Sequence, residues 1–381
     1  MTESAPAPRP APSVAEASPA LLFPVPLESA ALDAVDALAT GTAWWPAPLA
    51  WCAVHGPQAG AALNGLVTNE VTALAEGTGQ RAVTLTPKGK VITDLLLLRE
   101  GAERLLVATP PAGMDPWLGI LRKYVNPRLA RATDERGAMD AVVVAGAGAA
   151  ALLAPMTALG TAEALGALAP WQQVAGTVGA GVVRVVAHPL WDGVPGYLLV
   201  TDAAAMGAVQ GWLTAHGAHA APPAVGELLR VAAGVPALGR DMDEGTLVQE
   251  ANLDGLGAVS FTKGCYTGQE TVARVHFRGH VNRHLRRLRP VDGRSPVPAG
   301  AWLVDAEGKR VGAVTSAAWH PQRGPMALGM VRRELSPGAT VRAQWGDPTE
   351  GPPTGGVQVV VEVVVEVVVE AVAPEGRPPA G

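Results

Sequence analysis

The chain has 381 residues, of which 48% are hydrophobic and only 4% aromatic, and its formal net charge is −5 at pH 7. That length allows two or three domains with substantial cores, whereas a mildly acidic chain lacks the overall positive charge that general nucleic-acid binding requires. We therefore expect a globular monomer without a nucleic-acid partner.

The start of the chain is rich in Ala and Pro and lacks the cationic residues and apolar run of a secretory signal. We predict that residues 1–24 are a disordered lead-in. No stretch reaches the roughly 18 uncharged apolar residues of a membrane helix. Cys52 and Cys265 lie far apart, which indicates a reducing compartment rather than a disulfide framework. We expect a cytoplasmic protein that contacts no membrane and holds no metal.

Residues 25–137 are predicted to form the first part of an α+β domain. Alternating and continuous apolar runs predict four strands, at 51–54, 81–85, 91–98 and 103–107. Two helices are predicted at 58–66 and 116–124. The turn at 86–90 predicts a hairpin between the second and third strands. Proline in the first turn is typical of a helix start, which favours a helix beginning at Pro116.

Residues 138–222 repeat this order and are predicted to form a second α+β domain. Strands are expected at 141–144, 182–187 and 197–200, and helices after Gly146 and at 204–216. Gly146–Ala151 also fits the relaxed dinucleotide pattern G-x-G-x-x-A. That pattern needs an acidic residue about 20 residues on, at the end of a second strand. Glu163 is the nearest acid and lies in a helix-like stretch, so nucleotide binding is only a weak alternative.

The remaining chain divides into three parts. Residues 223–289 begin with a helix at 225–231 and return to the first domain. Residues 290–347 carry short apolar runs split by turns, which predicts a small β-barrel. Residues 348–381 are of low complexity, and Val357–Val372 repeats Val-Val-Val-Glu. We favour a disordered tail over an added edge strand, whose odd-numbered face would be all valine.

The most informative stretch is Ser260–Glu270, which reads Ser-Phe-Thr-Lys-Gly-Cys-Tyr-Thr-Gly-Gln-Glu. Glycines on both sides of Cys265 let the backbone turn sharply, and a basic tract follows directly. A nearby cation favours the thiolate, which is the nucleophilic form of cysteine. Cys265 is therefore either a reactive thiol or a small buried hydrophobe, and we favour the first. Lys263 either lowers the pKa of Cys265 or packs as a turn residue.

Lys263–Glu270 resembles the signature of the YgfZ branch of the glycine-cleavage T-protein superfamily, whose members are folate-binding proteins tied to iron–sulfur cluster synthesis or repair. Residues 65–71, 87–95, 240–243 and 278–283 are also similar to that family. The resemblance implies an α+β fold in which intertwined domains form a ring around a central folate channel, with a small C-terminal β-barrel. It implies tetrahydrofolate, or a polyglutamylated folate, as cofactor and iron–sulfur clients or assembly factors as partners.

The same resemblance implies the site residues. Cys265, Lys263 and Asp94 would carry any chemistry. The residues implied in folate binding are Asp94, Arg230, Asn69, Tyr266, Gln269, Glu270, Arg274, Arg278 and Arg283. Asn69 is alternatively a helix cap, which we favour. T-proteins anchor the pterin with the acid of a Gly-Tyr-Glu sequence, but this chain reads Gly196-Tyr197-Leu198, and leucine cannot accept a hydrogen bond.

Two functions follow as hypotheses. The first is a tetrahydrofolate-binding protein that supports iron–sulfur cluster assembly or repair through Cys265 and is not itself an enzyme. The alternative is a folate-dependent aminomethyl or one-carbon transferase, or a demethylase, in which Asp94 is the general base.

Overall fold

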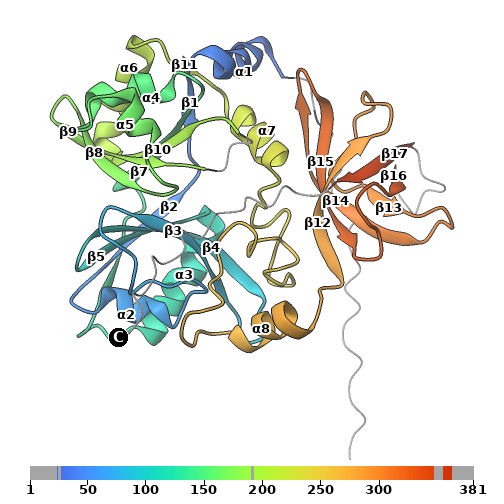
Figure 1. The fold of residues 1–381 in the computed structure, drawn as a ribbon, viewed down its shortest axis with the longest axis horizontal. Coiled ribbons are helices and arrows are strands. Elements are labelled where there is room, and N and C mark those ends of the chain that lie inside the picture. The colour runs from blue at the N-terminus through green and yellow to red at the C-terminus, as the bar shows by residue number, and fades with distance from the viewer. Residues whose placement is uncertain (1–23, 25–26, 190–192, 347–354, 363–381) are drawn as a thin grey trace, which may run out of the picture.

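The computed structural model describes residues 24, 27–189, 193–346 and 355–362. In that part of the chain, two sheet-containing halves lie on one side of the molecule and a β-barrel lies on the other, with α7 between them (Figure 1). The predicted lead-in, apart from Pro24, and the tail beyond Glu362 lie outside the described residues. No helix in the described ranges is both long and apolar enough to cross a membrane.

The first sheet is antiparallel with the order β3-β4-β5-β2-β6. Its strands are β2 (Ala50–His55), β3 (Gly79–Leu85), β4 (Val91–Gly101), β5 (Arg104–Thr109) and β6 (Arg131–Asp134). Two helices, α2 (Ala59–Asn64) and α3 (Pro111–Tyr124), pack on one face. The predicted hairpin and both helices are present, but α3 begins at Pro111 and contains Pro116 in its interior. Pro111 supplies the first-turn proline.

The second sheet has the order β11-β1-β7-β10-β9-β8. Its strands are β1 (Ala43–Pro46), β7 (Met139–Ala145), β8 (Gln173–Val178), β9 (Gly181–Ala187), β10 (Gly196–Asp202) and β11 (His219–Ala220). Its short helical segments are α4 (Ala149–Leu153), η1 (Ala154–Met156) and α5 (Ala162–Gly166), and its long helix is α6 (Ala203–Ala215). Because β1 pairs with β7, residues 43–46 belong to this second sheet, whereas the sequence predicts them within the first domain.

The two halves repeat a strand–turn–helix unit. Gly56 follows β2 with φ 135°, and Gly146 follows β7 with φ 128°. A Cβ on Gly146 would lie 2.4 Å from the carbonyl oxygen of Gly41, so only glycine fits. The backbone N–H groups of Ala147 and Gly148 donate to Leu38 and Gly41. The dinucleotide interpretation is therefore wrong, since these donors are used and β7 lies in an antiparallel arrangement with both neighbours.

The closed barrel has the order β12-β15-β14-β13-β16-β17. Its strands are β12 (Arg283–Pro290), β13 (Trp302–Val304), β14 (Arg310–His320), β15 (Gly324–Arg332), β16 (Thr340–Trp345) and β17 (Gly355–Glu362). The barrel therefore begins at Arg283 rather than at residue 290. The prediction of a disordered tail is wrong for 355–362, because β17 pairs with both β12 and β16 and its Val359 and Val361 are fully buried in the barrel.

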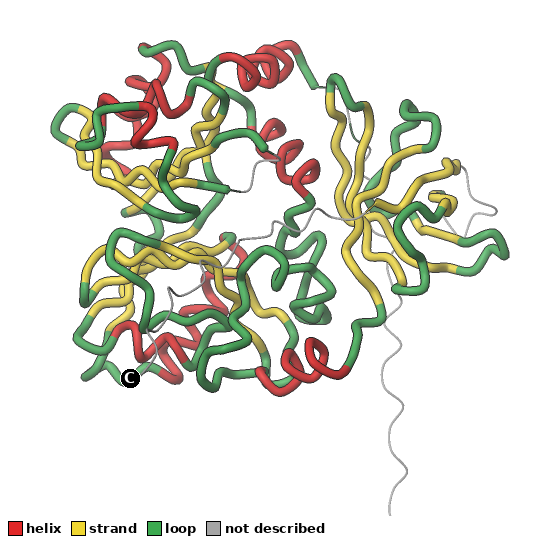
Figure 2. Tube along the Cα trace, viewed as in Figure 1, coloured by secondary structure: helices red, strands yellow, loops and turns green. Residues whose placement is uncertain are grey.

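The three parts meet in one core. The helix α1 (Ser29–Thr40) and the helix α7 (Pro223–Ala233) pack against each other, and α7 also contacts β1, β14 and β15. Residues 235–266 then pack apolar side chains on β3 and β4, and α8 (Gln269–Arg278) leads into the barrel. The segment from α7 to α8 thus runs between the two halves and the barrel (Figure 2). This arrangement encloses a central space.

Candidate functional site

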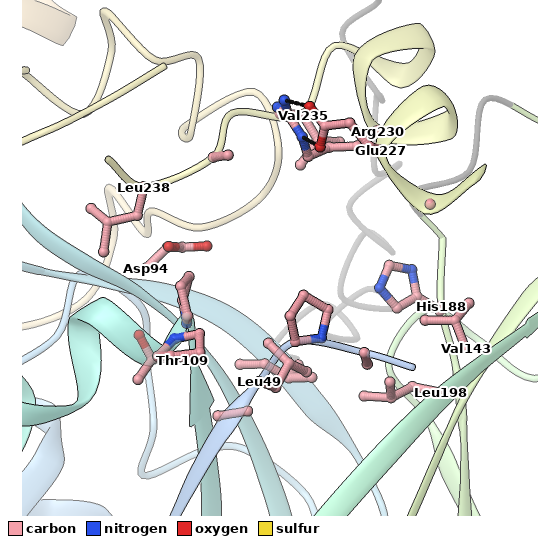
Figure 3. Close-up of a pocket in the computed structure, with 18 of the residues that line it drawn as sticks. Leu49, Asp94, Thr109, Val143, His188, Leu198, Glu227, Arg230, Val235 and Leu238 are labelled. Atoms are coloured by element: carbon pink, nitrogen blue, oxygen red, sulfur yellow. Dashed lines mark hydrogen bonds and ion pairs between the residues drawn. The ribbon is translucent and has the colours of Figure 1, made fainter. Parts of the chain in front are cut away.

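A cavity of about 560 Å³ lies where the parts of the molecule meet. Its walls come from β1, β3, β4, β5, β7, β10, α3, α7 and the loop at residues 235–240. Most lining side chains are apolar, and labelled examples such as Leu49, Val143 and Leu198 lie along the lower side of the space in Figure 3. The volume falls within the range of about 300–1,000 Å³ that is typical of small-molecule sites. The cavity corresponds in position to the predicted central channel.

A buried ion pair supplies the cavity with a polar contact. Arg81 on β3 and Asp94 on β4 lie 3.1 Å apart, with side chains 7% and 16% exposed. Among the described residues, Nη1 of Arg81 and Oδ1 of Asp94 have no hydrogen-bond partner although both atoms are buried. An unmade hydrogen bond of this kind costs about 1–3 kcal/mol or more for a charged group. Both residues line the cavity, so this pair is a charged part of an otherwise mostly apolar wall.

Two further cavity residues are neutral or apolar. His188 packs edge-on against Trp171, with ring centroids 4.9 Å apart. Burial, assisted by the charge of Arg81, lowers the pKa of His188 to about 3, so the imidazole is uncharged at neutral pH. Leu198 is 1% exposed and lines the cavity. The Gly196-Tyr197-Leu198 sequence thus contributes an apolar side chain to the cavity wall.

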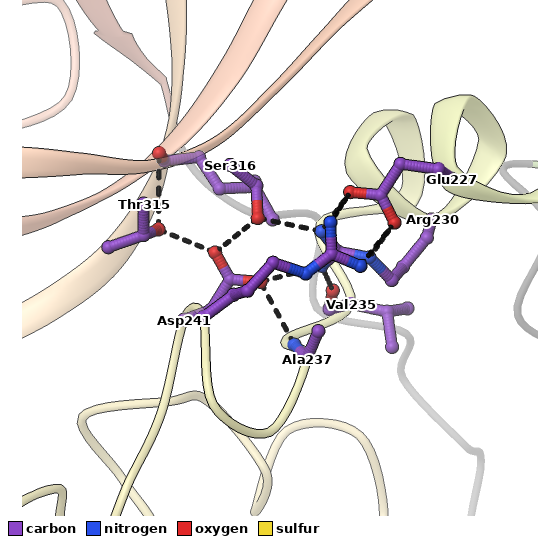
Figure 4. A network of polar contacts seen from close by, with 9 residues as sticks. Glu227, Arg230, Val235, Ala237, Asp241, Thr315 and Ser316 are labelled. Carbon is purple, nitrogen blue, oxygen red and sulfur yellow. Dashed lines mark hydrogen bonds and ion pairs between the residues drawn. The ribbon is translucent and has the colours of Figure 1, made fainter. Parts of the chain in front are cut away.

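Arg230 is the centre of a hydrogen-bond network that links three elements (Figure 4). Its five N–H groups donate to Glu227, Val235, Asp241 and Ser316, with two directed at Glu227. Burial disfavours its charge, but the bonds and charges of Glu227 and Asp241 outweigh that effect and raise the pKa of Arg230. Arg230 lines the cavity, yet these contacts engage all of its donors. Its arrangement indicates a clamp between α7 and the barrel strand β14.

The predicted thiol lies outside the cavity. Cys265 is exposed, whereas Cys52 on β2 is fully buried and burial raises its pKa to about 12. Neither cysteine lines the cavity. Cys265 belongs to the loop 257–268, which we call the Cys265 loop and which packs beside the turn of the β3–β4 hairpin. The hairpin fixes one end of this loop, because a Cβ on Gly268 would lie 2.7 Å from the carbonyl oxygen of Thr86.

Lys263 fastens the Cys265 loop to a neighbouring segment. Its Nζ donates to the carbonyl oxygens of Asn64, Val67 and Asn69 at 2.6, 2.9 and 2.7 Å. Burial lowers the pKa of Lys263 to about 8. All three ammonium protons thus bind backbone carbonyls, so Lys263 holds the Cys265 loop against residues 64–69.

Asn69 is not a helix cap, because it follows the end of α2 and precedes an irregular stretch. Its amide donates to the carbonyl oxygens of Arg81 and Gly257, each at 2.9 Å. Asn69 therefore joins β3 to the Cys265 loop. Tyr266 is 8% exposed within the apolar cluster beneath the loop, and burial raises its pKa to about 12.

The remaining predicted ligand residues lie away from the cavity. They are Gln269, Glu270 and Arg274 on α8, Arg278 at its end, and Arg283 at the start of β12. None of them lines the cavity. Arg274 and Arg278 are exposed, and Arg283 pairs with Glu250 at 3.2 Å. Within the described residues, no group of three His, Cys, Asp or Glu side chains is placed to hold a metal ion.

Comparisons with known families agree with this geometry. A sequence model of the GCVT N-terminal domain matches residues 47–263, and one of the CAF17 C-terminal β-barrel domain matches residues 286–364. The chain belongs to the YgfZ branch of the glycine-cleavage T-protein family. This confirms the family and the fold that the Cys265 signature predicted.

YgfZ-type relatives cover about two thirds of both chains. The tRNA-modifying protein YgfZ of Cronobacter sakazakii is 31% identical over 254 residues, which are 64% of this chain and 70% of that one. Its counterpart from Edwardsiella ictaluri is 33% identical over 253 residues, or 64% and 69%. The glycine cleavage aminomethyltransferase T of Bartonella henselae has the same fold, with a TM-score of 0.75, 21% identity and coverage of 88% and 90%.

Sequence reasoning missed four ionisable residues of the cavity. They are Arg81, His188, Glu227 and Arg240. Arg81 had a detectable signal, since it lies two residues before the position that pairs with Asp94 in the predicted hairpin. The other three come from loops and from α7, and only the tertiary fold brings them to this YgfZ-type cavity.

Proposed function

We propose that this chain binds a reduced folate in the central cavity and supports iron–sulfur cluster assembly or repair through the thiol of Cys265. The observation that carries the folate part is the Arg81–Asp94 pair, whose free donor and acceptor atoms are buried in the cavity wall. A pterin ring carries adjacent hydrogen-bond donors and acceptors on its edge, which matches such a pair. Arg81 and Asp94 would hold the ring in place of the acid that is absent at Leu198.

The rest of the cavity fits a flat heterocycle. Its walls are mainly apolar, with Trp45 and Trp171 among the lining residues, and His188 is uncharged. A neutral imidazole and apolar walls bind an uncharged ring without leaving buried charges unpaired. A bound folate would serve as the carrier of a one-carbon group, and the residues of this chain would bind and orient its ring.

Cys265 supports the second part of the proposal. It is the exposed cysteine of the two, and its loop is anchored by Lys263 and Gly268. The curated relatives are named tRNA-modifying proteins, so we propose that the clients include iron–sulfur enzymes that modify tRNA. A thiol at the surface is accessible to such a partner. Ligand binding in the cavity does not require this thiol.

The folate part is tested by anaerobic titration of the full chain with tetrahydrofolate, followed by calorimetry. We expect saturable one-to-one binding, and Asp94→Asn should weaken it by about tenfold to a hundredfold, because a charge-assisted hydrogen bond is worth about 1.5–3 kcal/mol. Absence of binding by the wild-type chain would contradict the proposal.

The thiol part is tested in a host that lacks its own YgfZ-type protein, by assaying an iron–sulfur tRNA-modifying enzyme. Cys265→Ala should abolish rescue, whereas Cys52→Ala is the matched control and should retain it. Full rescue by Cys265→Ala would show that the thiol is not needed.

A one-carbon transferase or demethylase is the second candidate. It is favoured by the position of Asp94, which lines the cavity and whose Oδ1 has no hydrogen-bond partner among the described residues, since a carboxylate can act as a general base. Methylamine-type donors and tetrahydrofolate would then yield methylene-tetrahydrofolate, and Asp94→Asn would stop turnover. No product from a panel of such donors would leave the binding function as the better account.

A further inference from the structure

A carboxylate between two guanidinium groups borders the cavity. The carboxylate of Glu227 on α7 accepts hydrogen bonds from Nε and Nη2 of Arg230 at 2.9 and 2.6 Å. It also accepts hydrogen bonds from Nη1 and Nη2 of Arg240 at 2.8 and 3.0 Å. All three residues line the cavity. In Figure 3, Glu227 and Arg230 lie across the cavity from Thr109 and Leu49.

The two arginines differ in how firmly they are held. The side chain of Arg230 is 14% exposed and is also bound by Asp241, Ser316 and the carbonyl oxygen of Val235. The side chain of Arg240 is 51% exposed. If Arg240 left Glu227, the carboxylate would keep both of its bonds to Arg230. Arg240 can therefore exchange its partner without leaving a buried charge unpaired, which is the costly outcome for a buried pair.

Arg240 is more available to a ligand than the other two arginines of the cavity wall, because its side chain is 51% exposed. Arg81 is already paired with Asp94, and Arg230 has all of its N–H groups engaged. An exposed guanidinium is planar and matches a carboxylate with two parallel hydrogen bonds. The arginines assigned to the folate tail from the sequence, Arg274, Arg278 and Arg283, do not line the cavity.

We propose that Arg240 binds a carboxylate on the tail of the cavity ligand, and that it releases Glu227 to do so. This inference rests on the proposed function, since it assigns the glutamyl carboxylates of folate to Arg240 while Arg81 and Asp94 hold the ring. The ligand class is a planar heterocycle with an anionic tail. A longer glutamyl tail adds carboxylates near the same exposed guanidinium and binds more tightly.

The test compares ligands with and without the tail on the full chain, by anaerobic calorimetry. The ligands are tetrahydrofolate, its triglutamate and 6-methyltetrahydropterin, which lacks the tail. We expect Arg240→Gln to weaken tetrahydrofolate and triglutamate binding by about tenfold, as for loss of a charge-assisted hydrogen bond, and to leave 6-methyltetrahydropterin binding unchanged. Arg240→Lys, which keeps the charge without the fork, should fall between. Arg278→Gln is the matched control and should bind all three ligands as the wild type does.

Two results would overturn the assignment while leaving the folate function intact. One is equal tetrahydrofolate affinity in Arg240→Gln and the wild type. The other is a loss that is the same for the tailed and tail-less ligands, which would make Arg240 a structural residue. Failure of the wild-type chain to bind any of the three ligands would instead overturn the proposed function itself, and the assignment with it.

Discussion

The central cavity and the Cys265 loop are built in opposite ways. The cavity draws its wall from segments between Trp45 and Arg240, is mostly apolar, and has one buried polar pair with free atoms. The Cys265 loop is one continuous stretch that exposes its thiol and is held by backbone contacts. The cavity proposed to bind the ligand and the exposed thiol of Cys265 are therefore in separate parts of this fold.

The two regions nevertheless share a strand. Thr68 and Asn69 bind the Cys265 loop at Ala258 and Gly257, and they also bind β3 at Val83 and Arg81. The side chain of Arg81 then reaches the cavity. Variants that affect one region alone therefore test how independent the two are.

The largest effect on stability is expected at Arg230, which clamps α7 to the barrel strand β14. Arg230→Leu removes five donors and leaves the buried Asp241 carboxylate without its charged partner. Breaking such a pair typically costs about 3–5 kcal/mol of unfolding free energy. Urea unfolding measures this loss, with Arg240→Gln as the control, since an exposed pair contributes about 0–1 kcal/mol. A loss below 1 kcal/mol in Arg230→Leu would contradict the clamp.

The next effect is expected at the Cys265 loop. Lys263→Met leaves the carbonyls of Asn64, Val67 and Asn69 without their shared donor and should cost about 1–3 kcal/mol. Hydrogen exchange of the Ser260 and Thr267 amides, which bind Thr68 and Gly65, should become faster. Tetrahydrofolate affinity should stay unchanged, and a parallel loss of that affinity would show that the two regions are coupled.

A smaller effect depends on pH and is confined to the cavity. The pKa of His188 is lowered to about 3, so the unfolded state binds more protons between pH 3 and 6.5 and stability falls as the pH drops through that window. We expect up to about 2 kcal/mol less stability at pH 5 than at pH 7.5 from this group. His188→Gln should flatten that part of the profile. Identical profiles in the two proteins would contradict a neutral His188.

The smallest effect is expected from the thiol itself. Cys265→Ala should change the unfolding free energy by no more than about 0.5 kcal/mol, because an exposed side chain makes few stabilising contacts. Alkylation provides the complementary measurement, in which the native wild-type chain takes up one equivalent of iodoacetamide and Cys265→Ala takes up none. Modification of Cys52 before unfolding would contradict its burial in the sheet.

Local patterns predicted most strands and the family, because these depend on neighbouring residues. The alternation from Val91 to Leu98 and the turn before it determine the hairpin. By contrast, β1 is four residues long, and its pairing with β7 depends on a contact about 100 residues away. The strand β17 was misjudged because low-complexity sequence gives no sign of the barrel that it completes.

The site was predictable only where it is continuous in sequence. Ser260–Glu270 identified the exposed thiol and the family, and Asp94 was found from the hairpin. The positions of Arg274, Arg278 and Arg283 were misleading, since a basic tract shows charge but not which face of the molecule carries it. Arg240 lies beside Asp241 in sequence, yet its contact with Glu227 on α7 appears only in the fold.

The glycines that open β17 determine where that strand starts. A Cβ on Gly355 would lie 2.4 Å from Nε1 of Trp345, and one on Gly356 would lie 2.8 Å from Nε of Arg342. The following Val-Val-Val-Glu units are interchangeable for an alternating strand, since a shift by four residues preserves which face each residue occupies. A gain or loss of one such unit after Glu362 would leave the residues that form β17 unchanged.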